Sequence, residues 1–182
     1  KKKITTVRIT DSEIVEIKQN FDENYGIRLV KDKKIASIQT TDKKNIEKSI
    51  DDCFTTIKNL KSRKFWKGLP HKVTTKKLEG VFDEKLYNIS GSNSMDIAQN
   101  MINSSNNEKV NTITGSLNIV SEVFKLVNSN GSDFEEKATY ISGIINAESE
   151  YGNIPVSGIG HASGRTLSNF SSEQIGNDAK TM

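Results

Sequence analysis

The residues best suited to chemistry in this sequence are its two histidines, its single cysteine, a pair of adjacent aspartates and several serines near the C-terminus. His71 and His161 have no glutamate beside them and no second histidine four residues away. A catalytic zinc site needs about three protein ligands and an open position, which this pattern does not supply. We interpret His161 as an exposed loop histidine rather than as a metal ligand or substrate contact.

The other candidate side chains also have simpler structural interpretations. Asp51 and Asp52 occupy adjacent positions of an expected helix and diverge by about 100°, which is typical of solvated surface carboxylates. Cys53 falls on the apolar face of that helix, where a thiol behaves as a small hydrophobe, and it has no cysteine partner. This cysteine usage favours a cytoplasmic setting. Ser157 and Ser163 lack the GxSxG elbow of a serine nucleophile, so we predict no catalytic, cofactor-binding or metal-binding residue.

One charged segment stands out. Between Lys61 and Lys77 the sequence has seven lysines or arginines and no acid, with Phe65 and Trp66 inside the run. Cations interleaved with aromatic rings can follow a phosphate backbone and stack on bases. The simpler interpretation, which we favour, is a solvated linker whose two aromatic rings anchor it to a neighbouring domain.

Composition excludes several classes of protein. The chain has 182 residues, of which 34% are hydrophobic, and a net charge of +3. This is enough for one lean domain or two small ones, and the charge is too small to identify a partner. The apolar runs are far shorter than the roughly 20 residues that a membrane helix requires, and no signal-peptide pattern follows the basic start.

The first third of the sequence predicts a sheet covered by a helix. Short alternating runs near Val7, Val15, Ile27 and Ile35 are separated by turns, which predicts an antiparallel meander of four strands. Thr41 or Asp42 can cap the following helix. Its apolar stripe should pack on the meander, with Phe54 inside the core, and consists of Ile46, Ile50, Cys53, Phe54, Ile57 and Leu60.

The second half predicts another helix and another meander. Residues 95–104 have helical spacing, and residues 110–148 contain strand-like runs around the turn from Asn128 to Gly131. We expect at least three strands there, whose long edges could mediate self-association. The tail is rich in glycine and serine, and Ser171 with Gln174 forms a capping box that opens a short helix. We interpret that short helix as a sign of truncation.

These patterns define an α+β fold with two sub-domains, each an antiparallel or mixed β-sheet packed with a helix, in a fragment of a larger protein. The predicted divisions are residues 1–61 for the first meander and its helix, 62–93 for the basic linker and connecting segment, and 94–182 for the middle domain with its helix, long-stranded meander and exit.

The sequence also resembles a known family. The segments that carry the resemblance are TVRITDSEIVEIKQNFDENYGIRLVKDKKIASIQTTD, GLP, GVFDEKLYNIS and VFKLVNSNGSDFEEKATYIS, followed by a Gly/Ser-rich exit. Together they are similar to the N-terminal and middle portions of the TldD/PmbA family, once called modulators of DNA gyrase. The exit SGIGHASGRTLSNFSSEQIGNDA is more like the PmbA (TldE) branch. Family members usually carry a helix and part of a strand ahead of the position of Thr5.

The resemblance implies a metallopeptidase system in which a TldD-like and a PmbA-like subunit act together on unfolded or leader peptides. The HExxxH zinc motif of the catalytic subunit would lie beyond the end of this chain, so zinc would belong to a TldD-type subunit or to a missing C-terminal part. We therefore expect this chain to be inactive alone. The alternative from a different class is a nucleic-acid-binding module that uses the segment between Lys61 and Lys77. In our primary interpretation the chain binds neither nucleic acid nor a membrane. The sequence leaves open whether the chain also forms a homo-oligomer.

Overall fold

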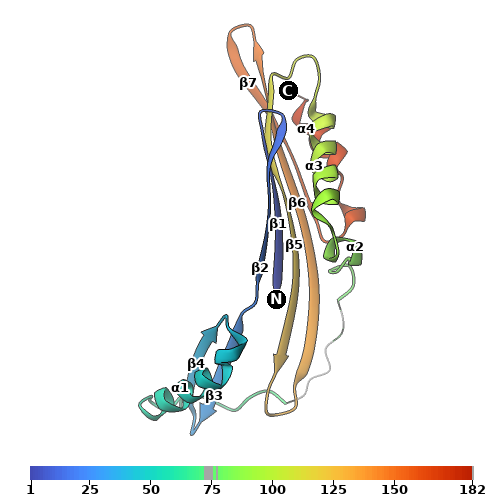
Figure 1. Ribbon diagram of the computed structural model, residues 1–182. Helices are drawn as coiled ribbons and strands as arrows, with labels where there is room; N and C mark the ends of the chain where they lie inside the picture. Colours follow the sequence, from blue (N-terminus) through green and yellow to red (C-terminus); the bar gives the residue numbers. More distant parts are fainter. Residues whose placement is uncertain (72–75, 77, 182) are drawn as a thin grey trace. The chain divides into compact units, whose positions relative to one another are not determined.

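The structure, a computed structural model, describes residues 1–71, 76 and 78–181 (Figure 1). Contacts divide the chain into two compact units. The smaller, which we call the two-stranded unit, consists of Lys1, Asp22–Thr75 and Lys125–Glu135. The larger, which we call the five-stranded unit, consists of Lys2–Phe21, Lys76–Phe124 and Glu136–Met182.

The larger unit is built on an antiparallel sheet whose strand order is β2-β1-β5-β6-β7. In β1, Lys2 lies opposite Glu122 of β5 and Ile9 lies opposite Gly115. Strands β6 and β7 also run antiparallel. The strands are β1 (Lys2–Thr10), β2 (Glu13–Asp22), β5 (Thr112–Val127), β6 (Asp133–Tyr151) and β7 (Ile154–Gly164).

Helices cover one face of this sheet. Helix α3 (Gly91–Ser105) and helix α4 (Ser172–Ala179) pack side by side along the strands, α3 against β1 and α4 against β7 (Figure 1). A short helix, α2 (Glu84–Tyr87), precedes α3, and a 3₁₀ turn, η2 (Leu167–Asn169), precedes α4. The fully buried large side chains of this core are Val7, Ile9, Leu86, Met101, Ile113, Leu117, Ile119, Ile141, Ile145 and Ile175.

Local sequence explains these elements. Ser90 accepts a hydrogen bond from the N–H of Asn93 at the start of α3, and Ser171 accepts one from Gln174 at the start of α4. Such side-chain caps satisfy donors that a helix leaves unpaired. The predicted helix start at Ser171 is therefore confirmed, with Ser171 as the N-cap. No helix in the described part of the chain combines the length and apolar composition needed to cross a membrane.

The smaller unit contains a β-hairpin and a helix. Strands β3 (Tyr25–Lys31) and β4 (Lys34–Thr40) form a two-stranded sheet, and helix α1 (Ile46–Lys58) packs against both. Asp42 caps the 3₁₀ turn η1 (Lys43–Asn45) that leads into α1. The small core comprises Ala36, Cys53 and Ile57, with Ile27, Leu29 and Ile38 packed against them.

The α+β class with antiparallel sheets and packed helices is confirmed, but the expected grouping of the first four strands is wrong. β1 and β2 belong to the sheet of the larger unit, and only β3 and β4 form the sheet beneath α1. Alternation along β1 determined which face is buried, since Val7 and Ile9 are inaccessible. It did not identify the neighbouring strand. The two units consequently have different limits from the predicted 1–61, 62–93 and 94–182.

The later meander differs from the expectation in two places. β5 is one continuous strand from Thr112 to Val127. Within it, the buried hydroxyl of Ser121 donates a hydrogen bond to the carbonyl of Leu86. The segment expected to be an irregular exit instead contributes strand β7. The predicted turn is present, with Asn128 Oδ1 accepting from the N–H groups of Asn130 and Ser132.

The apolar stripe of α1 is narrower than expected. Ile57 is 2% exposed, whereas Phe54 is 43% exposed, so the expectation that Phe54 lies in the core is wrong. A two-stranded sheet offers too little width to cover six apolar positions of a helix.

We expect Ile57→Ala to destabilise the smaller unit by about 2 to 5 kcal/mol, because it removes buried methylene groups and leaves a cavity. Phe54→Ala is the matched control on the same helix and should cost about 1 kcal/mol or less, because the ring is already partly in water. Denaturant titration of both variants measures the difference. Equal losses would mean that the two side chains are buried alike.

Candidate functional site

The two histidines lie in different surroundings, and neither belongs to a ligand set. His71 is exposed in a segment without regular structure. His161 is also exposed, but it lies on strand β7 opposite Ile144 rather than in the expected loop. Within residues 1–71, 76 and 78–181, no group of three or more histidine, cysteine or acidic side chains is arranged to hold a metal ion.

The remaining candidates are likewise not brought together. Asp51 and Asp52 are exposed on α1, while Cys53 is buried. Burial, with a smaller effect of the Asp52 charge, raises the pKa of the Cys53 thiol and keeps it protonated at neutral pH. Ser157 and Ser163 lie on β7, and no hydrogen bond within the described chain joins either to His161. The structure therefore offers no activated nucleophile among them.

A polar site that sequence reasoning missed is centred on Asp83. Its carboxylate accepts hydrogen bonds from the N–H of Lys85 at 2.8 Å and, through the other oxygen, from the N–H of Leu167 at 2.8 Å. The N–H of Asp83 donates to Thr139 Oγ1, and that hydroxyl donates to the carbonyl of Arg165. Asp83 thus ties the start of α2 to β6 and to the turn after β7. An aspartate directly before a helix was the available signal, since such residues favour the N-cap position.

Burial of Asp83 disfavours its charged form, but the backbone donors of Leu167, Lys85 and Leu86 outweigh this effect and lower the pKa of the carboxyl group. A carboxylate with a lowered folded-state pKa stabilises the protein fully above the unfolded-state pKa of about 3.9. This contribution is lost as the pH falls through the folded-state pKa. The site is an electrostatic clamp rather than a reaction centre.

We expect Asp83→Asn to destabilise the five-stranded unit by about 1.5 to 3 kcal/mol at pH 7, since hydrogen bonds to a charged acceptor are lost. Below about pH 4 the difference in stability between the variant and the parent should shrink, because protonation makes the parent carboxyl group neutral, as the asparagine amide already is. Denaturant unfolding between pH 2 and pH 7 measures this dependence. Glu84→Gln, at the neighbouring exposed position, serves as the control. If both variants follow the same pH profile, Asp83 does not supply the clamp.

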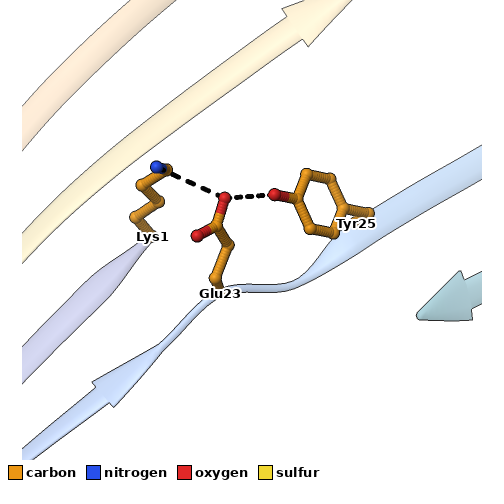
Figure 2. Close-up of polar contacts among 3 residues, drawn as sticks. All are labelled: Lys1, Glu23 and Tyr25. Atoms are coloured by element: carbon orange, nitrogen blue, oxygen red, sulfur yellow. Dashed lines mark hydrogen bonds and ion pairs between the residues drawn. The ribbon is translucent and has the colours of Figure 1, made fainter. Parts of the chain in front are cut away.

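A second carboxylate interaction lies at the beginning of β3. Figure 2 shows Glu23 between Lys1 and Tyr25, with an ion pair at 3.3 Å on one side and a hydrogen bond from the phenol on the other. The hydrogen bond from Tyr25 lowers the pKa of Glu23, with a smaller contribution from Lys1, and it raises the pKa of Tyr25. All three groups are solvent-accessible, so water and salt screen this cluster. Among its three residues only Glu23 is an acid, which does not make up a metal-ligand set.

The described part of the basic segment is partly held in place. The N–H of Arg63 donates to the carbonyl of Lys33 at 2.7 Å, and Trp66 is half-buried. Phe65, in contrast, is 95% exposed, so the expectation that both rings anchor the segment is wrong for this residue. Lys72 and Lys77 lie outside the described residues. Within the described part of this segment, Phe65 is therefore an exposed aromatic ring that neighbours cationic residues in the sequence.

An open groove of about 990 Å³ lies beside the turn that joins β6 to β7. Glu108 and Glu150 line it together with Lys109 and Lys180, so it carries charges of both signs. Asn111, another lining residue, donates its N–H to the carbonyl of Glu148 at 2.8 Å. The groove suits a polar ligand and contains no nucleophile paired with a base.

Comparison with known proteins defines the class. Residues 1–56 match the model of a family described as PmbA/TldA metallopeptidase domain 1. This N-terminal segment is therefore similar to the first domain of the PmbA/TldD family. The comparisons do not separate its PmbA branch from its TldD branch. No curated protein matched the sequence.

Three solved structures share the fold over 98% of this chain. They are a protein of Thermotoga maritima described as a modulator of a DNA gyrase (20% identity, TM-score 0.81), one of Bacteroides thetaiotaomicron described as a modulator of DNA gyrase (17%, 0.78), and TldE of Thermococcus kodakarensis (16%, 0.83). At these identities the similarity establishes the fold. The chain spans 41% of the first and third and 42% of the second.

Proposed function

We propose that this chain is a noncatalytic portion of a PmbA-like protein that acts with a TldD-like subunit in a cytoplasmic metallopeptidase system on unfolded or leader peptides. The observation that carries the proposal is the match of residues 1–56 to a domain described as part of a metallopeptidase. The fold shared with a TldE supports the same role, as does the PmbA-like sequence after Ser157.

The family implies zinc, and the described residues do not fit a zinc site. His161 projects from β7 opposite Ile144, and no acidic or histidine side chain joins it in a group of three within the described ranges. A catalytic zinc ion takes about three protein ligands and keeps one position open. In this proposal the zinc ligands belong to a TldD-type subunit or to a further part of a longer chain, and no step of peptide cleavage is assigned to residues of this chain.

The test measures zinc content and cleavage of an unfolded reporter peptide. We expect the chain alone to retain less than stoichiometric zinc after dialysis and to leave the peptide intact. A TldD-like subunit should bind the chain in a pull-down and should cleave the peptide faster in its presence. One tightly held zinc per chain, or cleavage by the chain alone, would identify it as catalytic. Absence of any binding to the TldD-like subunit would contradict the paired system.

A second candidate function is supported by Phe65. This ring is 95% exposed and follows Arg63 and Lys64 directly in the chain, which is the combination that single-stranded nucleic acids bind by stacking and phosphate contacts. The affinity for a fluorescent single-stranded DNA should then fall steeply between about 50 and 200 mM salt, because each phosphate contact adds to the slope of log affinity against log salt concentration.

Phe65→Ala is expected to weaken that binding by about 1 to 3 kcal/mol, the usual value of one stacked base. Phe54→Ala, at an exposed ring on α1, is the matched control and should bind like the parent. Fluorescence anisotropy at two salt concentrations measures both. Equal binding by the two variants would exclude a stacking role for Phe65.

A further inference from the structure

The turn between β5 and β6 carries two asparagines that hold the basic segment in place. Asn128 Nδ2 donates to the carbonyl of Pro70 at 3.0 Å, and Asn130 Nδ2 donates to the carbonyl of Leu69 at 2.9 Å. All four residues belong to the two-stranded unit. We call these two contacts the asparagine clasp. The clasp binds two consecutive carbonyls of a segment that lies outside any helix or strand.

The two asparagines of the clasp are restrained to different extents. Oδ1 of Asn128 accepts from the N–H of Asn130 at 2.9 Å and from the N–H of Ser132 at 3.0 Å, so three hydrogen bonds hold this side chain. Asn130 is exposed, and within the described chain its side chain makes only the bond to Leu69. Asn130 is therefore the freer of the two side chains.

The residue that follows Asn130 leaves its side-chain amide open to attack. Gly131 has a φ of +86°, and nothing lies within 4 Å of a β-carbon built on it. Its N–H donates to the carbonyl of Asn128 at 3.2 Å, the long limit of ordinary N–H···O distances. A peptide nitrogen that no side chain shields can attack the amide carbon of a preceding asparagine, which makes such asparagines thermolabile.

We propose that Asn130 is a site of spontaneous deamidation whose product opens the asparagine clasp. The nitrogen of Gly131 gives up its proton to hydroxide and forms a bond to Cγ of Asn130, and the side-chain nitrogen leaves as ammonia. One water molecule then opens the five-membered ring at either carbonyl, which yields an aspartate or an isoaspartate. No oxidant or reductant takes part. The inference is independent of the peptidase role proposed above.

Both products place a carboxylate where the clasp needs a donor. An ionised carboxylate only accepts hydrogen bonds, so at position 130 it faces the carbonyl oxygen of Leu69 as a second acceptor. This half of the clasp is lost, while the bond from Asn128 to Pro70 remains. The isoaspartate also lengthens the backbone of the turn by one methylene group. Because the amide does not re-form in water, the fraction of loosened basic segments increases with the age of the protein.

The test of the reaction incubates the whole folded chain at mildly alkaline pH and maps it by mass spectrometry. Trypsin releases one peptide, Leu126 to Lys137, that contains both asparagines. We expect Asn130 to deamidate no more than about thirtyfold more slowly than in the unfolded chain, because only two hydrogen bonds of the fold oppose the attack. Asn128 should stay intact over the same time, and the rate at Asn130 should rise with pH.

The test of the consequence uses two substitutions. Asn130→Asp reproduces one product, and Asn130→Gln is the matched control, which keeps an amide donor and reacts slowly because its ring would have six members. Trypsin cleavage after Lys67 should become about two- to tenfold faster in Asn130→Asp, the effect of one lost hydrogen bond, and should be unchanged in Asn130→Gln. The fluorescence of Trp66, the single tryptophan, follows the same loosening.

Three results would each overturn the proposal. The first is an Asn130 that stays intact in the folded chain while the unfolded chain reacts. The second is deamidation of Asn128 and Asn130 at equal rates in the folded chain, since the unequal restraint of the two side chains would then have no effect. The third is equal cleavage after Lys67 in the Asp and Gln variants of position 130, which would show that the basic segment does not depend on the clasp.

Discussion

Ile141→Lys is expected to unfold the five-stranded unit, whereas Ile144→Lys leaves it folded. The two positions lie on the same strand, β6, but face opposite sides of the sheet because side chains alternate along a strand. Ile141 is 0% exposed beneath the helices, and Ile144 is 45% exposed on the other face. A lysine ammonium at position 141 would have to be desolvated in an apolar core, at a cost of about 4 kcal/mol or more, a large part of a typical domain's stability.

Circular dichroism melts and the dispersion of amide signals measure this difference. The Ile144 variant, which is the matched control, should lose about 1 kcal/mol or less, as surface substitutions usually do. The comparison separates a sheet with one covered face from a sheet covered on both faces. If both variants unfold, the second face is also packed in solution.

Gly160→Ala should displace α4 from β7. The added β-carbon would meet the backbone oxygen of Ile175 at 1.8 Å and the backbone nitrogen of Ala179 at 2.9 Å. Backbone atoms cannot turn aside as a flexible side chain can, so the helix must move. We expect a loss of about 3 kcal/mol, at the upper end of the usual cost of overpacking.

Limited proteolysis and a denaturant titration test this result. Cleavage between residues 165 and 181 should become faster, because α4 is no longer held against the sheet. Gly26→Ala is the control: it is also a strand glycine, and nothing lies within 4 Å of its added β-carbon. Unchanged stability in the Gly160 variant would mean that α4 does not sit as close to β7 as the structure shows.

Much of the fold could be predicted because it is encoded locally. The Asn128 turn, the Ser171 cap and the alternation along β6 each depend on residues a few positions apart. The partner of β1 could not be predicted in this way. Thr6 Oγ1 donates to Asn118 Oδ1 across β1 and β5, and these residues are 112 positions apart. Period-two alternation specifies a buried face but is the same for any neighbouring strand.

Strand β7 was missed for a different reason. Its glycines argue against a strand when judged by propensity alone. Gly160 is nevertheless required there, because the backbone of Ile175 approaches the strand too closely for a side chain, and Asn169 makes a tight approach at Gly164. Glycine in a strand commonly marks such a close approach. Here tertiary packing outweighed local preference. Ser157, His161 and Ser163 therefore lie on an edge strand and not in the loop that the sequence predicted.

The site around Asp83 could be predicted only in part. Its position directly before Glu84 and Lys85 was a sufficient signal for a helix cap. Its bond to the N–H of Leu167 connects residues 84 positions apart, and no periodic pattern reports such a contact. The same limit applies to Phe54. Helical spacing predicted that its side chain lies on the apolar face of α1, but it could not predict that the sheet beneath α1 is too narrow to cover it.

The pairing of β1 with β5 has a consequence for synthesis on the ribosome. The β1–β2 hairpin emerges well before its neighbour in the sheet, which begins at Thr112. At roughly 5 to 20 residues per second, an interval of about 5 to 20 seconds separates the two strands. During that time the inward side chains Val7 and Ile9 have no core to enter, while β3, β4 and α1 can already close on each other. A nascent chain of this kind presents an unpaired apolar strand, so its yield should depend on chaperones that bind such segments and should improve when translation of residues 41–111 is accelerated.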